Sequence, residues 1–306
     1  MAQYPLRTFR TQSQQNLTPI LQQGHRLQQT LFQSGVAIII FLFSFHMPSF
    51  AERLSLLELG IIGGSAYLPD YPAAHQNHWK SLAAPYVVYR GSIFRSDRDG
   101  ARARLFKQKH YEVEMSFAGS FNSNSKDNDA RRGMPDLDYL GEVGPRLSVP
   151  LGTLGWNTKL KLYVPVRAVF SSDLTNLKHR GFTFSPNLTL IAPNFIRPEW
   201  IGFSAISSTF ANRQLSAYFY DVAPEFALPS RPTYDARGGY LGSDFSVGLL
   251  MTLHPRWKLF LGSAVSYYEG TANTSSPLFR DRLGYTGVVG VAWIFYISKR
   301  RAADYP

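Results

Sequence analysis

The 306-residue sequence contains no cysteine, and only 17% of its residues are charged. Without cysteine the chain has no disulfide scaffold, no thiolate zinc site and no cysteine nucleophile. It also lacks the composition of a disordered protein, because 44% of its residues are hydrophobic and 14% are aromatic. Long apolar runs are missing too, apart from one stretch near the N-terminus. This shortage argues against a polytopic helical membrane protein.

The one apolar stretch spans residues 35–45 and is too short for a membrane-spanning helix of about 20 residues. It matches the apolar centre of a signal peptide, since Ser49 and Ala51 provide small residues at the expected cleavage positions. The residues before it include arginines and no acid, although this segment is longer than usual. We therefore predict a signal peptide over residues 1–51, with an anchor helix as the alternative.

The rest of the chain shows strict alternation of apolar and polar residues. In residues 156–170 the even positions other than Thr158 are apolar, whereas the odd ones include Lys159, Lys161 and Arg167. The pattern recurs at 100–106, 111–121, 137–149, 241–253 and 285–295. Long strands with one apolar face are typical of membrane β-barrels, where pairing satisfies every backbone group. The sequence thus predicts an all-β fold, a transmembrane antiparallel up-and-down β-barrel over residues 52–296.

The connections between these segments alternate between short and long. An even number of strands places both termini in the periplasm, with short turns there and longer loops outside the cell. Counting the turn at 97–100 as a hairpin gives twelve strands, and merging that hairpin into its neighbours gives ten. The long, extracellular connections are expected at 69–78, 122–136, 171–180, 223–237 and 269–283.

Charged residues on the polar face are expected to form cross-strand pairs inside the barrel. A hairpin centred on Gln108 would place Arg104 opposite Glu112. The same register would place Arg102 opposite Glu114. Opposite charges that face each other across strands stabilise a sheet by about 0.2 to 1 kcal/mol per pair.

The next hairpin extends this prediction. A turn over residues 150–155 would place Asp138 opposite Arg167 and Glu142 opposite Tyr163. We interpret these charges as lumen-filling structure; a charged constriction that selects solutes is the alternative, because twelve strands lie between a filled and an open barrel. The complete set of expected lumen-facing charges is Arg102, Arg104, Glu112, Glu114, Asp138, Glu142, Lys159, Lys161 and Arg167.

Four segments in order, 63–72, 85–91, 94–100 and 147–170, resemble the MipA/OmpV family of bacterial outer-membrane proteins. The resemblance extends over residues 56–295 and implies a barrel in the bacterial outer membrane. One member of the family is described as a scaffold that bridges a lytic transglycosylase and a peptidoglycan synthase. Other members are described as porin-like or adhesive, so the resemblance indicates the location more firmly than the activity.

On this basis we expect a non-enzymatic scaffold for cell-wall enzymes, with a narrow porin-like channel or an adhesin as the alternative. A barrel hydrolase is a distant third, since the chain has no recognisable catalytic motif. The expected periplasmic contact consists of cations in the 107–109 turn and the basic tail at 297–306, namely Lys107, Lys109, Lys299, Arg300 and Arg301. The tail itself is expected to be disordered.

The remaining predictions concern ligands. No cofactor is expected, and the spacing of His75 and His78 is interpreted as part of a solvated loop rather than a metal site. The formal net charge of +11 suits the anionic headgroups of outer-membrane lipid and lipopolysaccharide, as well as peptidoglycan carboxylates. It does not indicate binding of nucleic acid.

Overall fold

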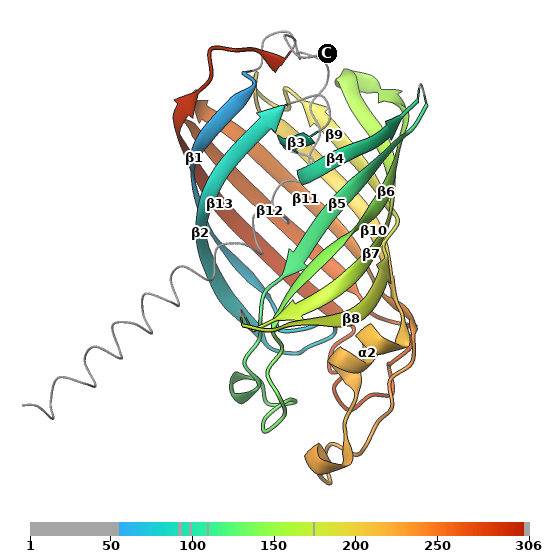
Figure 1. Cartoon of the computed structure of the whole chain (residues 1–306). Coiled ribbons are helices and arrows are strands. Elements are labelled where there is room, and N and C mark those ends of the chain that lie inside the picture. Colours follow the sequence, from blue (N-terminus) through green and yellow to red (C-terminus); the bar gives the residue numbers. More distant parts are fainter. Residues whose placement is uncertain (1–54, 91–93, 98–99, 109, 174, 303–306) are drawn as a thin grey trace, which may run out of the picture.

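The computed structural model describes residues 55–302 except 91–93, 98–99, 109 and 174, and it describes the backbone alone for 94–97, 100–104 and 107. The predicted signal peptide lies outside these residues. The described chain is a barrel of antiparallel strands (Figure 1). The strands are β1 Leu57–Pro69, β2 Asn77–Arg90, β3 Phe94–Asp97, β4 Gly100–Lys107, β5 Glu112–Ser120, β6 Tyr139–Leu154, β7 Thr158–Ser172, β8 Leu177–Phe184, β9 Asn187–Pro193, β10 Ile201–Ala211, β11 Gly239–His254, β12 Trp257–Tyr267 and β13 Leu283–Ile297.

The thirteen segments form a barrel wall of twelve strands, as the sequence predicts, because β8 and β9 together occupy one strand position. The two segments β8 and β9 lie end to end along β7, and the break between them falls at Ser185 and Pro186. Proline has no N–H to donate, so it interrupts the ladder at that point. The pairings then continue from β9 through β10 to β13, and β13 pairs with β1.

The alternating segments of the sequence appear as strands, which confirms the predicted periodicity. In the strands other than β3 and β4, side chains on one face point outward and are mainly apolar, with Trp79, Trp257 and Trp293 among the exposed aromatic residues. The opposite face carries polar and charged side chains along β5 to β8, and mainly small or apolar ones, such as Ile62, Ala84 and Val88, along β1 and β2. Aromatic residues on the outer surface suit the lipid–water boundary.

The predicted register of two hairpins is wrong. Arg104 pairs with Glu114 and not with Glu112, while Arg102 pairs with Ser116. The turn closes between Gln108 and Tyr111, so the first pairs are three residues out of the predicted register, and a bulge after Arg104 reduces this offset to two. The hairpin therefore shifts by two residues, which keeps each side chain on its face but changes its partner.

The second correction concerns β6 and β7. The strand β6 continues through Pro150 to Leu154, so the turn lies at the 3₁₀ segment Gly155–Asn157 and not at 150–155. Glu142 consequently faces Val169 across the ladder rather than Tyr163. A bulge between Pro150 and Gly152 absorbs the break that the proline causes. Asp138 does not face Arg167, because β6 begins only at Tyr139.

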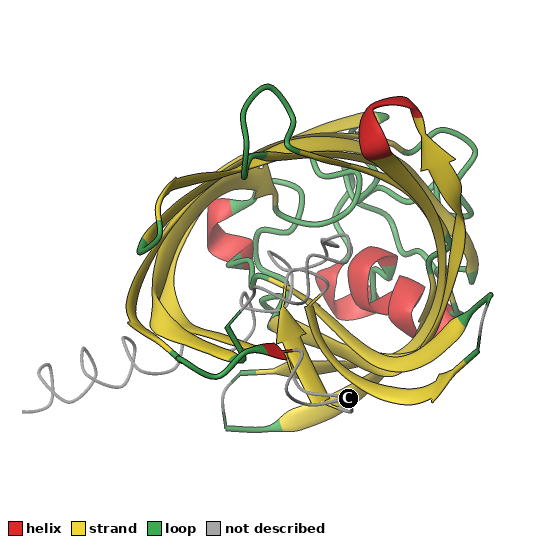
Figure 2. Cartoon of the chain, turned by 90° about the horizontal axis from the view of Figure 1, so that it is seen from above, coloured by secondary structure: helices red, strands yellow, loops and turns green. Residues whose placement is uncertain are grey.

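The two ends of the barrel differ. One end, here called the turn end, carries short connections and the C-terminal residues, at the top of Figure 1. The predicted long connection at 171–180 is wrong, because β7 continues to Ser172 and β8 begins at Leu177, which leaves only residues 173–176 between them. The other end, the loop end, carries the long connections at 70–76, 121–138, 212–238 and 268–282, so these four predicted long loops gather on one side. Viewed from above in Figure 2, these loops and the helix α2, Arg213–Tyr220, lie across the far end of the barrel.

These loops fold into a structure with its own hydrophobic core, which we call the loop cap. Asn212 begins α2 by accepting a hydrogen bond from the Leu215 N–H. The helix then buries Leu215, Phe219 and Tyr220 in a core shared with other loops and with the adjacent strand ends. The remaining members of this core include Tyr71, Ala74, Leu137, Leu140, Val169, Ala211, Val222, Ala236, Leu241 and Leu278. Within the described residues, no helix has the length and apolar character needed to cross a membrane.

The strand pairing of the barrel wall is least extensive at β3 and β4. Strand β3 pairs with β2 only at Tyr89 and Arg90, and β4 pairs with β5 only as far as Ser116. Among the described residues, the edge of β2 from Asn77 to Val88 has no strand beside it on the side away from β1. We call this interval the β2–β5 seam.

Candidate functional site

The interior wall formed by β5 to β8 carries a ladder of ion pairs. Its most buried pair joins Arg146 and Glu114, with 2.6 Å between the guanidinium and carboxylate and both side chains almost inaccessible to solvent. These residues face each other directly across β5 and β6. The Arg146 guanidinium also lies over the ring of Tyr163, 4.7 Å from its centre. The buried Arg146 guanidinium thus has a carboxylate partner, to which it donates a hydrogen bond, and an aromatic ring on which it stacks, as a buried charge requires.

Two further pairs continue the ladder toward the loop end. Arg167 lies 3.6 Å from Glu142, and the Thr183 hydroxyl donates to the same carboxylate at 3.1 Å. Arg180 lies 3.5 Å from Asp138, and its guanidinium stacks 4.3 Å from the centre of the Tyr218 ring in α2. The ladder thus connects the wall to the loop cap.

A separate cluster lies near the turn end. The Glu58 carboxylate is 2.8 Å from Arg90 and 2.7 Å from Lys258, and all three side chains are buried. The Tyr86 hydroxyl donates to Glu58 at 3.3 Å. Sequence analysis did not find this cluster, since Glu58 and Lys258 belong to strands from opposite ends of the chain. No local pattern points from one to the other.

The predicted lumen charges fall into three groups. Glu114, Glu142, Asp138 and Arg167 belong to the ladder, although not with the predicted partners. Lys159 and Lys161 lie on the same face of β7 as Tyr163, and among the described residues neither makes an ion pair. Glu112 is partly buried at the start of β5, while the side chains of Arg102 and Arg104 lie outside the described set.

The described part of the basic tail, residues 298–302, pairs with the start of the chain's first strand at the turn end, contrary to the expectation of a disordered tail. The Ser298 N–H donates to the Leu57 carbonyl, and the Leu56 N–H donates to the Arg300 carbonyl, each at 2.8 Å. Backbone pairing with the start of β1 leaves Lys299, Arg300 and Arg301 exposed on the rim. The predicted partners Lys107 and Lys109 have side chains outside the described set.

Two buried arginines hold the loop cap together. Arg231 donates to the carbonyls of Ala130, Arg132 and Phe226, at distances from 2.7 to 3.1 Å. Arg131 donates to the carbonyls of Phe219 and Pro135, at 3.1 and 3.2 Å. The guanidinium groups therefore satisfy loop carbonyls that burial removes from water. Sequence analysis treated these segments as plain loops and missed both clamps.

Tyr71 lies at the centre of the cap. Its hydroxyl donates to the Leu278 carbonyl at 2.8 Å, and the Arg131 guanidinium lies over its ring. Burial raises the pKa of Tyr71 to about 12, and the positive charges of Arg131 and Arg280 only partly offset this effect. Burial likewise lowers the pKa of Arg131.

His75 of the first loop and His78 at the start of β2 have different partners. His75 lies 2.9 Å from Asp281, whereas His78 lies 2.8 Å from Asp70. Each ring therefore ties the loop to a separate carboxylate. Across the part of the chain that the structure describes, no group of three or more His, Asp or Glu residues is arranged to hold a metal ion.

A twelve-stranded wall with an apolar outer face, a polar interior and long loops at one end defines a protein of the bacterial outer membrane. The chain belongs to the family of MltA-interacting protein MipA, which matches residues 61–295. No curated protein sequence matches the chain.

Solved structures with a similar fold include three bacterial proteins. The translocator domain of the autotransporter NalP from Neisseria meningitidis has 11% identity and a TM-score of 0.44, covering 90% of this chain and 96% of its own. LpxR from Salmonella typhimurium has 9% identity and a TM-score of 0.38, with 78% and 100% covered. An outer membrane channel from Pseudomonas putida F1 has 12% identity and a TM-score of 0.37, with 82% and 100% covered.

Proposed function

We propose that this outer-membrane barrel is a non-enzymatic scaffold that holds a peptidoglycan-remodelling enzyme of the lytic transglycosylase class at its turn end. The observation that carries the proposal is the loop cap, whose buried core lies across the loop end of the lumen. A barrel that serves as an open pore needs a water-filled path, whereas a packed core in that path favours a structural role. The description of the family as MltA-interacting supports the same class of partner.

The exposed cations of the tail suit the contact surface. Lys299, Arg300 and Arg301 stand on a rim that backbone bonds to β1 hold in place. Expected topology puts this rim in the periplasm, where enzymes acting on the cell wall are found. Charged rims mainly increase association rates and are weakened by salt, since the Debye length is about 8 Å at physiological ionic strength. A peptidoglycan synthase is the second partner class that the family resemblance implies.

Binding of purified MltA to the immobilised full-length protein tests the proposal. Replacing Lys299, Arg300 and Arg301 by Gln should slow association and reduce its salt dependence. A matched control replaces three exposed cations of the loop cap, Lys126, Arg132 and Arg213, by Gln and should bind like the wild type. Equal loss in both variants would locate the contact elsewhere, and absence of binding by the intact protein at low salt would contradict the scaffold.

Planar-bilayer conductance addresses the alternative. A scaffold with a packed loop cap should give no stepwise current at any voltage that the bilayer tolerates. Stepwise current from the wild-type protein would favour the narrow channel instead.

A further inference from the structure

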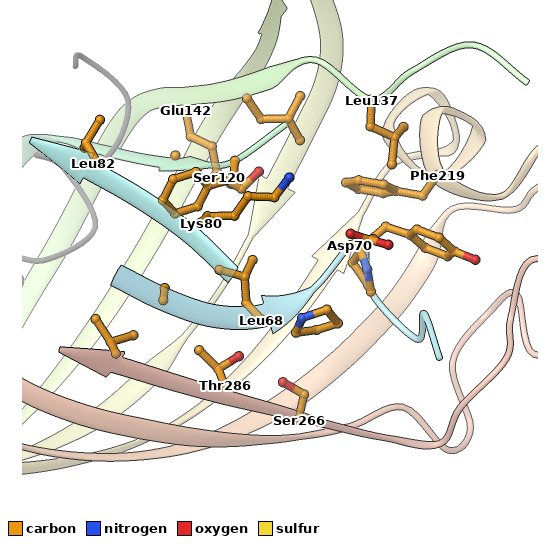
Figure 3. A pocket seen from close by; sticks show the side chains of 18 of the residues that line it. Leu68, Asp70, Lys80, Leu82, Ser120, Leu137, Glu142, Phe219, Ser266 and Thr286 are labelled. Carbon is orange, nitrogen blue, oxygen red and sulfur yellow. The ribbon is translucent and has the colours of Figure 1, made fainter. Parts of the chain in front are cut away.

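A cavity of about 340 Å³ lies inside the barrel, between the wall formed by β13, β1 and β2 and the inner side of the loop cap. Its size is within the range of small-molecule sites, which is about 300 to 1,000 Å³. Most of its lining is apolar. Figure 3 shows Leu68, Leu82, Leu137 and Phe219 among the side chains that line it. Representative lining residues are Ile62, Leu68, Leu82, Leu137, Phe219 and Val288.

One cation reaches into this apolar space. Lys80 lies on the inner face of β2, opposite Ala66 of β1, and its side chain is half-buried. Figure 3 shows the side chain extending into the pocket beside Ser120. Among the described residues, no hydrogen bond or ion pair involves the Lys80 ammonium group. An ammonium group in an apolar site is unfavourable unless a counter-charge is present.

The acids around the same pocket already have partners. Asp70 accepts a hydrogen bond from Asn128 at 2.7 Å and lies 2.8 Å from His78. Asp138 and Glu142 are paired with the arginines of the ladder. The pocket therefore contains compensated carboxylates and an uncompensated ammonium group, which is a combination that favours an anion.

The pocket also lies beside the β2–β5 seam. Its lining includes Lys80, Leu82 and Ala84 on the β2 side and Gly119 and Ser120 on the β5 side. Both edges of the β2–β5 seam thus contribute to one cavity.

We propose that this pocket binds an amphipathic anion with a single alkyl chain. The chain lies among the apolar residues beneath the loop cap, and the anionic head group accepts a charge-assisted hydrogen bond from Lys80 Nζ. A fatty carboxylate and an alkyl phosphate share this chemistry. The assignment stands on the cavity and on Lys80, and it is independent of the scaffold role.

The test uses the full-length protein in nanodiscs of zwitterionic phospholipid, titrated calorimetrically with dodecanoate, dodecyl phosphate and uncharged dodecanol, with empty nanodiscs subtracted. The wild type should bind one molecule of an anionic ligand. Lys80→Met should weaken this binding by roughly tenfold or more and leave dodecanol binding unchanged. The matched control Lys126→Met removes a cation from the exposed surface of the loop cap and should change nothing.

The two anions separate the sources of the head group. Preference for dodecanoate would indicate a fatty acid, and preference for dodecyl phosphate a lipid phosphate. A second variant, Leu82→Trp, fills the apolar part and should abolish binding of all three compounds. Equal anion binding by wild type and Lys80→Met, or failure of the wild type to bind any of the compounds, would overturn the proposal.

Discussion

The two halves of the interior wall differ in how their charged side chains are compensated. Along β5 to β8 each acid of the ladder has an arginine partner, as the buried Glu114–Arg146 pair shows. Along β13, β1 and β2 the inner face at the level of the pocket is small or apolar, with residues such as Ala66 and Val288, and Lys80 is its cation there. The comparison indicates that the carboxylates of the ladder are compensated within the chain, whereas the apolar half leaves one ammonium group for a ligand.

The largest expected effect on stability comes from disrupting the buried ion pair of the charged half. Glu114→Gln leaves the Arg146 guanidinium buried without its carboxylate, so the free energy of unfolding should fall by about 3 to 5 kcal/mol. Lys80→Met, on the other half, removes a charge that has no described partner and should change it by less than about 1 kcal/mol. Urea unfolding in lipid vesicles, followed by tryptophan fluorescence, measures both.

A double variant completes this test. Adding Arg146→Met to Glu114→Gln removes the stranded charge and should recover much of the loss. Equal losses for Glu114→Gln and Lys80→Met would show that the two halves do not differ in this respect.

A smaller and more local effect is expected in the loop cap. Arg231→Met removes the donors to three loop carbonyls, which should open the cap at a cost of about 2 to 3 kcal/mol while the strands stay paired. Limited proteolysis should then cut within residues 212–238. The control Arg213→Met removes only an exposed pair, 3.6 Å from Asp235, and should leave the rate of cutting unchanged.

Alkaline pH provides a second test of the cap. The pKa of Tyr71 is about 12 in the folded protein and near its ordinary value of 10 when unfolded. The contribution of the neutral phenol is therefore complete below pH 10 and is lost as pH rises toward 12. Proteolysis of the cap should accelerate over this interval, and less so in Tyr71→Phe, which at neutral pH should cost about 1 kcal/mol through the lost hydrogen bond. An identical pH profile in both proteins would exclude Tyr71 as the group responsible.

The smallest effect has the opposite sign. Lys161 lies on the charged half, yet no described residue pairs with it. Lys161→Met should leave the free energy of unfolding unchanged or raise it by about 1 kcal/mol, because a half-buried charge is replaced by an apolar side chain. A clear loss in the same urea titration would show that Lys161 has a stabilising partner.

These contrasts also explain what could be predicted from the sequence. The alternation along 156–170 is local, so the strand β7 and the inward direction of Arg167 follow from the residues alone. The partner of Arg104 depends on where a turn closes, and the actual turn and its bulge moved it from Glu112 to Glu114. Period two preserved the face while the register changed.

The loop cap was beyond such reasoning for a different reason. Its core joins segments far apart in the chain, as when Tyr71 contacts Leu278. One local pattern was available, since Asn212 followed by Leu215 and Phe219 has the spacing of a capped amphipathic helix. The arginine clamps had no such pattern, because Arg231 binds backbone carbonyls, which every residue provides.

The β2–β5 seam has a mechanical consequence. The first and last strands of the barrel are joined over the long register from Glu58 and Ile297 to Tyr67 and Gly287, and the bonds of the tail extend that junction. At β2 and β3 the register contains two residue pairs. Under lateral stress the barrel should therefore open between β2 and β3 and not between β1 and β13. The strands β13, β1 and β2 would then move together as one rigid unit.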